Sequence, residues 1–285
     1  MTAGGKEGKM ENLKALSYDL RKNVVDMIME GKGGHIGGDM SVMDILVELY
    51  FEQMNISPEQ MEDPDRDRFV MSKGHSVEAL YAVLAAKGFF PIEQVIREFS
   101  KFGSKFIGHP NNKLPGIEMN SGSLGHGLPV CVGMALAGRM DKKAYRVYTV
   151  MGDGELAEGS VWEGVMAAHQ YKLDNLCAVV DRNRLQISGN TEDVMSHDSQ
   201  EERWSSFGWH VISIDGNNYQ ELKAAFEEAK TVKGSPTVII ANTVKGFGSP
   251  LMENKANWHH KVPNAEEYTQ IMKDLETGKE AALHE

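Results

Sequence analysis

Hydrophobic residues along the chain form two alternating patterns. Short runs rich in Val, Ile and aromatic residues have the length of strands and end at Gly, Asp or Asn. Longer segments between them place apolar residues at helical spacing. The predicted strands span 68–71, 146–151, 176–180, 211–214 and 237–241, and the predicted helices between them span 76–87, 126–140, 158–171 and 219–230. Strands that alternate with helices predict an α/β fold, a doubly wound parallel sheet with helices on both faces.

Other patterns occupy the two ends of the chain. Apolar residues with a 3.6-residue period predict a helix over 11–30, and a glycine-rich break follows it. Ser41 and Asp44 have the spacing of a capping box, which predicts that a second helix begins at Ser41. The polar C-terminal helix could pack on the domain or on another chain. The chain thus divides into a disordered tail (1–10), one α/β domain (11–263) and a polar C-terminal helix (264–285).

Composition narrows the class of protein. Hydrophobic residues make up 41% of the chain and charged residues 25%, the balance of a soluble globular protein. The formal net charge of −11 disfavours nucleic acid and anionic membranes as partners. No apolar stretch has the length of a membrane span, and the N-terminus lacks the apolar core of a secretory signal. Cys131 and Cys177 lie in apolar runs, so we expect buried, reduced thiols and a cytoplasmic protein.

Two predicted strand ends bring oxygen ligands to one edge of the sheet. A strand leads into the tight turn Gly152-Asp153-Gly154, and a helix and a second strand then lead to Asn183. A right-handed crossover places both strand ends on the edge where open α/β sheets bind ligands. Asp153 and Asn183 offer a carboxylate and an amide oxygen, which suit Mg²⁺ or Ca²⁺. Gly152 and Gly154 let the backbone approach a diphosphate closely, so we predict a metal and diphosphate site.

Histidines in glycine-rich loops are the second candidate for chemistry. A single histidine is most often a surface or core residue, but several in such loops can bind phosphate or hydroxyl groups and move protons. Four follow a glycine and two follow Trp258: His35, His75, His109, His126, His259 and His260. The remaining four are expected to be structural or surface residues: His169, His197, His210 and His284.

The spacing of Gly-Asp-Gly and Asn183 resembles the signature of thiamine-diphosphate enzymes. More narrowly, the chain is similar to transketolase, because five further segments match that family in order: 34–38, 69–75, 108–110, 122–127 and 245–250. The resemblance implies the diphosphate-binding domain of the thiamine-diphosphate-binding fold. It also implies transfer of a two-carbon ketol unit from a ketose to an aldose, with thiamine diphosphate and Mg²⁺ or Ca²⁺ as cofactors.

Roles for individual residues follow from the same resemblance. The metal ligands would be Asp153, Asn183 and the backbone carbonyl of Leu185. His35 and His259 would assist proton transfer at the sugar C3 hydroxyl, His75 would contact the diphosphate, and His109 would contact the C1 hydroxyl. The implied cofactor-binding residues are His75, Gly122, Leu124, Gly125, His126, Gly152, Asp153, Gly154, Glu158, Asn183 and His259.

Three of these positions carry a qualification. His259 is preferred to His260 because Trp-His-His aligns with Ser-His-Gly of the family. His126 stands where many full-length transketolases have Gln, although a histidine can still donate a hydrogen bond. Glu158 and Glu163 favour the dipole of the helix that they open. The resemblance adds that Glu158 contacts its counterpart across a subunit interface.

The resemblance covers only the first of three domains of the family enzyme. We find no candidate segment for the pyrimidine-binding and C-terminal domains, which hold the cofactor-activating glutamate and phosphate-binding arginines. The implied protein is the N-terminal subunit of a split transketolase, active on sugar phosphates in an α₂β₂ complex with a second subunit that carries these domains.

Three alternatives to this assignment stay open. The first is 1-deoxyxylulose-phosphate synthase or dihydroxyacetone synthase, which share the cofactor. The second is a split homologue that acts on deoxy- or sulfo-sugars. The third is a non-catalytic regulatory subunit, which is disfavoured because Asp153, Asn183 and the matched histidines are all present.

Overall fold

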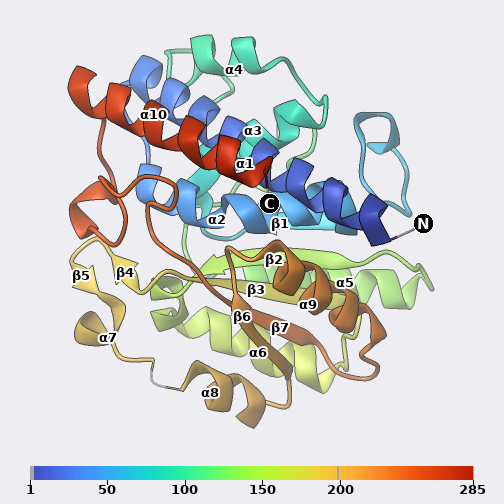
Figure 1. Ribbon diagram of the computed structural model, residues 1–285. Helices are drawn as coiled ribbons and strands as arrows, with labels where there is room; N and C mark the ends of the chain where they lie inside the picture. Colours follow the sequence, from blue (N-terminus) through green and yellow to red (C-terminus); the bar gives the residue numbers. More distant parts are fainter. Residues whose placement is uncertain (1–2, 198, 285) are drawn as a thin grey trace.

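The computed structural model describes residues 3–197 and 199–284, with side chains from Leu13 onward. Its centre is a five-stranded sheet in which neighbouring strands pair in parallel (Figure 1). The first and last residues of each of these strands lie within two positions of the predicted ones. In spatial order the strands are β1 (Arg68–Met71), β2 (Val147–Gly152), β3 (Leu176–Arg182), β7 (Thr237–Asn242) and β6 (His210–Asp215).

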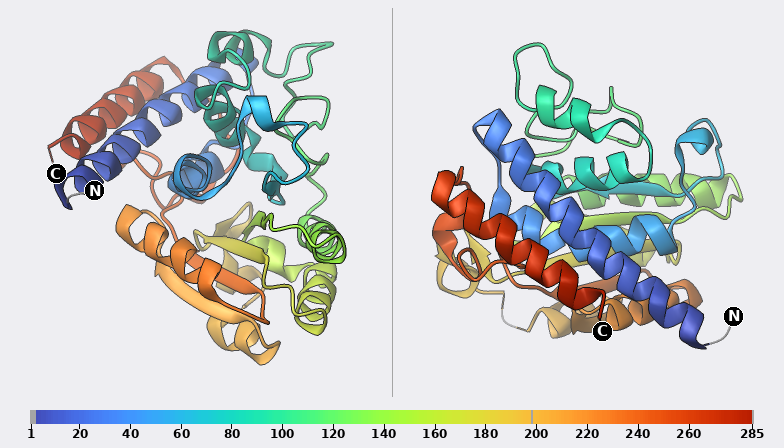
Figure 2. Two further views of the ribbon diagram at one scale, coloured as in Figure 1. Left: turned by 90° about the vertical axis from the view of Figure 1, so that its right-hand side faces the viewer. Right: turned by 45° about the horizontal axis from the view of Figure 1, so that its top comes forward.

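Helices cover both faces of this sheet (Figure 2). Alternate residues of β3 face opposite ways: Cys177 and Val179 belong to one core, and Ala178 and Val180 to the other. The first core is built with α1 (Ala3–Gly31), α2 (Ile36–Glu48), α3 (Val77–Ala86), α4 (Ile92–Glu98), α9 (Tyr219–Thr231) and α10 (Ala265–Ala282). The second is built with α5 (Gly127–Met140), α6 (Gly159–Gln170) and α8 (Gln200–Ser206). The predicted doubly wound α/β fold is therefore confirmed.

The register of the sheet brings the carboxyl ends of its central strands together. Gly152 at the end of β2 lies opposite Asp181 of β3, and Asp181 lies opposite Ala241 of β7. Helix α6 connects β2 to β3, which completes the predicted βαβ unit. Asp153 and Asn183 follow these strand ends, so both leave the sheet at the same edge.

Helix α1 begins earlier than predicted. Its first residue is Ala3, so residues 3–10, which we expected to form a disordered tail, belong to the helix. Residues 1–2 lie outside the described residues. The prediction relied on apolar periodicity, and residues 3–9 lack it because they contain one Ala among Gly, Lys and Glu.

Helix α2 begins at Ile36 rather than at Ser41, so the predicted capping box is wrong. Ser41 lies inside the helix, where its hydroxyl donates to Asp181 (2.7 Å). Glycine disfavours a helix, but at position 37 the neighbouring backbone leaves room for no larger residue. A Cβ atom on Gly37 would lie 2.7 Å from the carbonyl oxygen of Trp258. The helix thus extends into a glycine-rich segment that the sequence indicates as a break, and there glycine allows close contact with the backbone of Trp258.

Short elements without a hydrophobic period were not predicted. They are α4, α8, α7 (Thr191–Val194) and a hairpin of β4 (Leu185–Gln186) and β5 (Gly189–Asn190). The hairpin and α7 directly follow Asn183, so they shape the surroundings of the predicted site.

The polar C-terminal helix, predicted over 264–285, is α10, and it packs along α1 (Figure 2). Its Ile271 and Leu275 side chains are buried in the core. The Tyr268 hydroxyl donates to Asp26 of α1 (2.8 Å). Of the two packing modes left open by the sequence, the structure therefore shows packing on the body of this chain.

Two expectations from composition can be compared with the structure. Cys131 and Cys177 are both free and buried, as predicted. Burial raises the pKa of both thiols, so they stay protonated at neutral pH. Among the described residues, no helix combines the length and apolar composition that a membrane span requires.

A buried ion pair joins three helices on the first core. Arg21 of α1 donates to both carboxylate oxygens of Asp44 in α2 (3.0 and 2.8 Å) and to the Met40 carbonyl. Asp44 also accepts hydrogen bonds from the Tyr219 hydroxyl (3.2 Å) and the Asn217 amide (2.8 Å) at the start of α9. Arg21 and Asp44 are almost completely buried, so each depends on the other for charge compensation.

We predict that Asp44→Ala lowers the free energy of unfolding by about 3–5 kcal/mol, because it leaves the Arg21 guanidinium buried without its counter-ion. Urea denaturation followed by circular dichroism measures the change. Glu227→Ala is the control, since it removes an exposed ion pair with Lys230 and costs at most about 1 kcal/mol. Equal losses in the two variants would contradict the importance of the buried pair.

Candidate cofactor-binding site

A cavity of about 350 Å³ opens at the carboxyl edge of the sheet, beyond the ends of β2 and β3. It is lined by loops that the sequence singled out and by the β4–β5 hairpin. The lining residues are His35, Lys73, His75, Gly122, Leu124, Gly152, Asp153, Gly154, Glu155, Asn183, Leu185, Gln186, Ile187, Ser188, Lys245 and His259. Most of the predicted cofactor-binding residues, from separate segments of the chain, therefore meet around one space.

The three predicted metal ligands line this cavity together. The Asp153 carboxylate accepts hydrogen bonds from the backbone N–H groups of Gly154 (2.9 Å) and Arg184 (2.7 Å), which ties β2 to the Asn183 turn. Burial and the nearby Asp181 raise the pKa of Asp153. Positive charge in the cavity would therefore stabilise its ionised form.

The predicted ligand set combines one carboxylate, one amide oxygen and the carbonyl of Leu185. In the described part of the chain, no group of three or more His, Cys, Asp or Glu residues could hold a metal ion. The predicted set is of a different kind, because Asp153 is its only member of those types. Hard oxygen ligands of this kind fit a magnesium ion that takes its remaining ligands from phosphate and water. Metal binding itself stays a prediction.

Two buried lysines that the sequence reasoning overlooked complete the cavity. Lys73 follows β1 and pairs with Asp181. Lys245 follows β7 and donates to the Leu185 carbonyl (2.7 Å) and to Nδ1 of His259 (2.9 Å). Within the described residues, Lys245 forms no ion pair. Burial and the Lys73 charge lower the pKa of Lys245 to about 8. A buried cation without a counter-ion suits an anionic ligand.

A sequence signal for these lysines does exist. Lys73 and Lys245 both follow a predicted strand and precede a glycine, inside segments already matched to the family. A cation beside a flexible backbone at the ligand-binding edge is the pattern that could have identified them.

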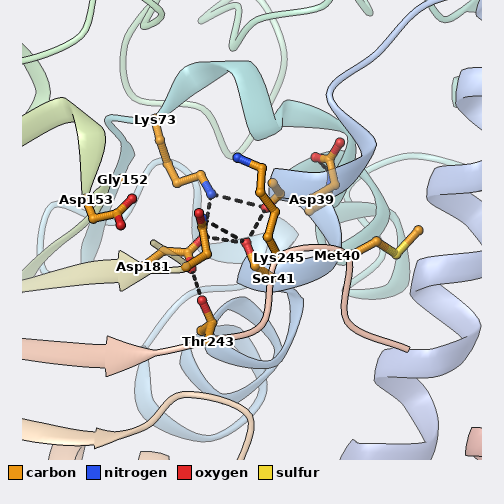
Figure 3. A network of polar contacts seen from close by, with 12 residues as sticks. Asp39, Met40, Ser41, Lys73, Gly152, Asp153, Asp181, Thr243 and Lys245 are labelled. Carbon is orange, nitrogen blue, oxygen red and sulfur yellow. Dashed lines mark hydrogen bonds and ion pairs between the residues drawn. The ribbon is translucent and has the colours of Figure 1, made fainter. Parts of the chain in front are cut away.

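Polar contacts around Asp181 fix the position of Lys73 (Figure 3). The Asp181 carboxylate is fully buried and also accepts hydrogen bonds from the hydroxyls of Ser41 (2.7 Å) and Thr243. The Lys73 ammonium donates in addition to the Gly38 carbonyl (3.1 Å). The Lys73 side chain, which lines the cavity, is therefore held by a hydrogen-bonded unit that joins α2 and β3 to the segments after β1 and β7.

Five histidine rings gather at one side of the cavity. The ring of His35 lies 5.2 Å from His75, 6.2 Å from His109, 5.6 Å from His259 and 4.7 Å from His260, measured between centroids. The four histidines predicted as catalytic are thus neighbours. His259 lines the cavity, whereas His260 is exposed beside it.

Burial and nearby cations keep three of these histidines neutral, namely His35, His75 and His259. They lower the pKa of His35 to about 4 and that of His259 to about 3, and they lower the pKa of His75 well below its usual value. Because Lys245 donates to Nδ1 of His259, the neutral ring carries its proton on Nε2. His259 can therefore act as a hydrogen-bond donor through Nε2.

Three predicted site side chains lie outside the cavity lining. His126 is exposed, and its Nδ1 lies 3.2 Å from the carbonyl oxygens of Ser123 and Leu124. Glu158 is exposed at the start of α6. His109 belongs to the histidine cluster but is also exposed. Their predicted roles with cofactor or substrate stay predictions.

The four histidines that we expected to be structural lie elsewhere. None is among the described residues that line the cavity. His197 is buried, His210 pairs with Glu228 at the surface, and His169 and His284 are exposed.

Glu155 is a further residue that the sequence reasoning missed. Its buried carboxylate accepts hydrogen bonds from the backbone N–H groups of Gly125 (2.9 Å) and Gly152 (3.1 Å) and from the Ser72 hydroxyl. Gly125 does not itself line the cavity. It has a φ of +83°, and a Cβ atom there would lie 2.6 Å from Glu158 Cβ, so only glycine fits. Glu155 therefore holds the 122–127 loop against the end of β2.

We predict that Glu155→Ala lowers the free energy of unfolding by about 2–6 kcal/mol, because two backbone N–H groups lose their acceptor at about 1–3 kcal/mol each. Thermal and urea unfolding of the variant measure this loss. Glu280→Ala, which removes an exposed carboxylate on α10, should change stability by less than about 0.5 kcal/mol. Wild-type stability of Glu155→Ala would show that the loop is held by other contacts.

Comparison with known proteins assigns the chain to a family. The thiamine diphosphate binding domain of transketolase matches residues 13–281. One subunit of the apulose-4-phosphate transketolase of Phocaeicola vulgatus is 48% identical over 94% of this chain and 95% of its own. A 6-deoxy-6-sulfo-D-fructose transketolase subunit of a Clostridium species is 42% identical over 90% of this chain and 94% of its own.

Full-length transketolases match over less than half of their length. Human transketolase is 40% identical over 94% of this chain, which corresponds to 42% of the human protein. The solved transketolase of Campylobacter jejuni superposes with a TM-score of 0.86 at 27% identity, over 95% of this chain and 45% of its own.

The chain therefore belongs to the transketolase family. It corresponds to the diphosphate-binding domain of that family, and its relatives of similar length are named as separate subunits of transketolases. The resemblance stated from the sequence, to the N-terminal subunit of a split transketolase, is confirmed.

Proposed function

We propose that this chain, together with a second subunit, transfers a two-carbon ketol unit from a ketose phosphate to an aldose with thiamine diphosphate and Mg²⁺. The observation that carries the proposal is the buried, unpaired Lys245 between the predicted metal ligands and a cluster of neutral histidines. The family supplies the reaction class. The two free, buried cysteines support a reducing, cytoplasmic setting.

The donor set of the cavity fits the diphosphate and its metal. Lys73, Lys245 and His75 would face the diphosphate, while Asp153, Asn183 and the Leu185 carbonyl would hold Mg²⁺. When bound, thiamine diphosphate would supply a nucleophilic carbon and an electron sink for cleavage between C2 and C3 of the ketose.

Residues of this chain would manage the protons of the reaction. His35 is neutral at neutral pH, so its unprotonated ring nitrogen can accept the proton of the C3 hydroxyl, while neutral His259 would assist as a hydrogen-bond donor. Nε2–H of His259 would donate to a sugar oxygen, and Lys245 fixes that tautomer. His109, exposed beside His35, would bind the C1 hydroxyl.

We further propose that the second subunit carries the pyrimidine-binding and C-terminal domains, in an α₂β₂ heterotetramer. Relatives of similar length are named as subunits of a transketolase, which supports a partner chain. Glu158, at which the family resemblance places a contact between subunits, is exposed directly before α6.

Substrate choice separates the remaining alternatives. The relatives named for apulose 4-phosphate and 6-deoxy-6-sulfo-D-fructose favour an unusual sugar over ordinary pentose phosphates. Assays of the reconstituted complex with donor and acceptor panels would decide between them. Pyruvate as the preferred donor would indicate 1-deoxyxylulose-phosphate synthase activity, and formaldehyde as the preferred acceptor would indicate dihydroxyacetone synthase activity.

We predict that the purified chain alone shows no ketol transfer with thiamine diphosphate and Mg²⁺, and that activity appears on adding the partner subunit. The reason is that the group that activates the cofactor would come from the partner. Both states can be measured with a coupled assay for the aldose product. Full activity of the isolated chain would contradict the split arrangement.

Asp153→Ala provides the control for this assay. The variant should lose both metal binding and activity in the complex, because a Mg²⁺ site has few protein ligands to spare. Asp193→Ala, which removes a nearby exposed carboxylate, should retain both. Unchanged activity of Asp153→Ala would support the alternative of a regulatory subunit.

We predict that Lys245→Met weakens thiamine diphosphate binding by about 1.5–3 kcal/mol, roughly a 10- to 150-fold rise in Kd, because a charge-assisted contact is lost. Lys245→Arg keeps the charge and should lose less. Calorimetric titration of the complex measures the affinity. The exposed Lys233→Met variant is the control, and equal affinities of Lys245→Met and wild type would exclude Lys245 from the diphosphate site.

A further inference from the structure

Helices α2 and α3 are capped by side chains of each other. Neither helix has a side-chain cap from its own N-cap residue. Asp39, in the first turn of α2, accepts a hydrogen bond from the backbone N–H of Ala79 in α3 (3.0 Å). Glu78, in the first turn of α3, accepts one from the backbone N–H of His35, directly before α2 (3.3 Å). Two acidic side chains therefore join the starts of both helices.

These helix starts carry two of the clustered histidines. His35 is the N-cap residue of α2, and His75 lies in the 3₁₀ turn that leads into α3. The Glu78 carboxylate also lies against the backbone at Gly34, where a Cβ atom would lie 2.4 Å from Glu78 Oε1. A shift of Glu78 or Asp39 would therefore move a segment that bears a histidine.

The two carboxyl groups are completely buried beside each other. Asp39 and Glu78 have 0% exposure, and their side chains interact directly. Asp39 Oδ2 and Glu78 Oε2 receive no N–H or O–H group from any other described residue. Two ionised carboxylates in this place would repel each other and leave both oxygens without a donor. One shared proton removes both problems, because a protonated carboxyl donates to its neighbour.

The surroundings of the pair favour one negative charge and not two. The charged group that faces the pair from a neighbouring element is Lys73, which already pairs with Asp181. In Figure 3, the Asp39 carboxylate points away from this Lys73–Asp181 pair. The N-termini of α2 and α3 stabilise one anion. Burial raises the pKa of Asp39 to about 7 and raises that of Glu78 well above its usual value.

We propose that Asp39 and Glu78 share a proton and act together as positioning residues for His35 and His75. The pair would act on the reaction only through these histidines, so this role rests on the proposed function. The shared proton and the reciprocal caps do not depend on it.

Single amide substitutions separate positioning from a purely structural role. Asp39→Asn and Glu78→Gln each supply a permanent N–H in place of the proton, so we expect kcat within about twofold of wild type. Asp39→Ala removes the cap on α3 and should lower kcat of the complex about tenfold or more, with a smaller change in KM, because His75 and His35 lose their alignment. Rescue by Asn but not by Ala is the expected signature.

Glu48→Gln is the matched control. Glu48 is another buried carboxyl of α2, and its pKa is also raised by burial, but it lies at the opposite end of the helix and accepts from Gln53 (2.7 Å). This variant should keep the kcat of the wild type. A kcat of Asp39→Ala equal to that of the wild type would overturn the positioning role.

A second measurement requires no activity and stays informative if Asp39→Ala does not fold. The infrared difference spectrum between wild type and the Asp39→Asn/Glu78→Gln double variant at pH 7 should contain the C=O band of a protonated carboxylic acid. Because the native state holds this proton more tightly than the unfolded state, the pair by itself makes Tm fall as pH rises from about 5 to 8, whereas the buried neutral histidines make Tm rise over the lower part of this range in both proteins. The signature of the shared proton is therefore a difference: Tm of the double variant should increase relative to that of the wild type as pH rises from about 5 to 8.

The outcomes of these experiments are distinguishable. Absence of the protonated carboxyl band, together with equal Tm slopes in both proteins, would overturn the shared proton. If the wild-type complex shows no ketol transfer, the proposed function fails. The infrared and thermal results then still decide whether the pair shares a proton.

Discussion

The buried carboxylate of Asp181 joins the segments on which the cavity depends. It sits near the carboxyl end of β3, pairs with Lys73 after β1, and accepts hydrogen bonds from Ser41 of α2 and Thr243 after β7. A buried charge is tolerated only when it is paired and hydrogen-bonded. These segments therefore cannot move independently. The Asp181 carboxylate fixes both the direction of the Lys73 side chain and the position of the first turns of α2.

Local charge in the cavity opposes the charge of the whole chain. The formal net charge is −11, yet Lys73 and Lys245 are both buried at the carboxyl edge of the sheet. Lys73 forms an ion pair with Asp181, whereas Lys245 forms no ion pair among the described residues. A low-dielectric site strengthens this field. An acidic protein can therefore hold an anionic cofactor at this edge, and the same field adds to the burial that lowers the pKa of His35, His75 and His259.

The site combines histidine rings that carry no charge with backbone segments that are held in fixed positions. Rings that carry no charge at neutral pH add no charge of their own to the cavity. Their placement relies on groups outside the histidine cluster: Glu155 holds the 122–127 loop, and the carboxyl pair of Asp39 and Glu78 joins the starts of α2 and α3. This chain thus supplies fixed walls for the cavity, and its relatives are either longer transketolases or proteins of similar length named as transketolase subunits.

The amino-acid sequence by itself determined the order of strands and helices, the edge of the sheet that forms the site, and the meeting of Asp153 with Asn183. The hydrophobic period and the turn residues are local properties of the sequence. In a parallel sheet with right-handed crossovers, the ends of neighbouring strands then lie at the same edge. Only the tertiary structure decided that α2 starts at Ile36, that Lys245 has no counter-ion among the described residues, and which groups hold the loops. Those features arise from contacts between residues far apart in sequence, and no local pattern encodes such contacts.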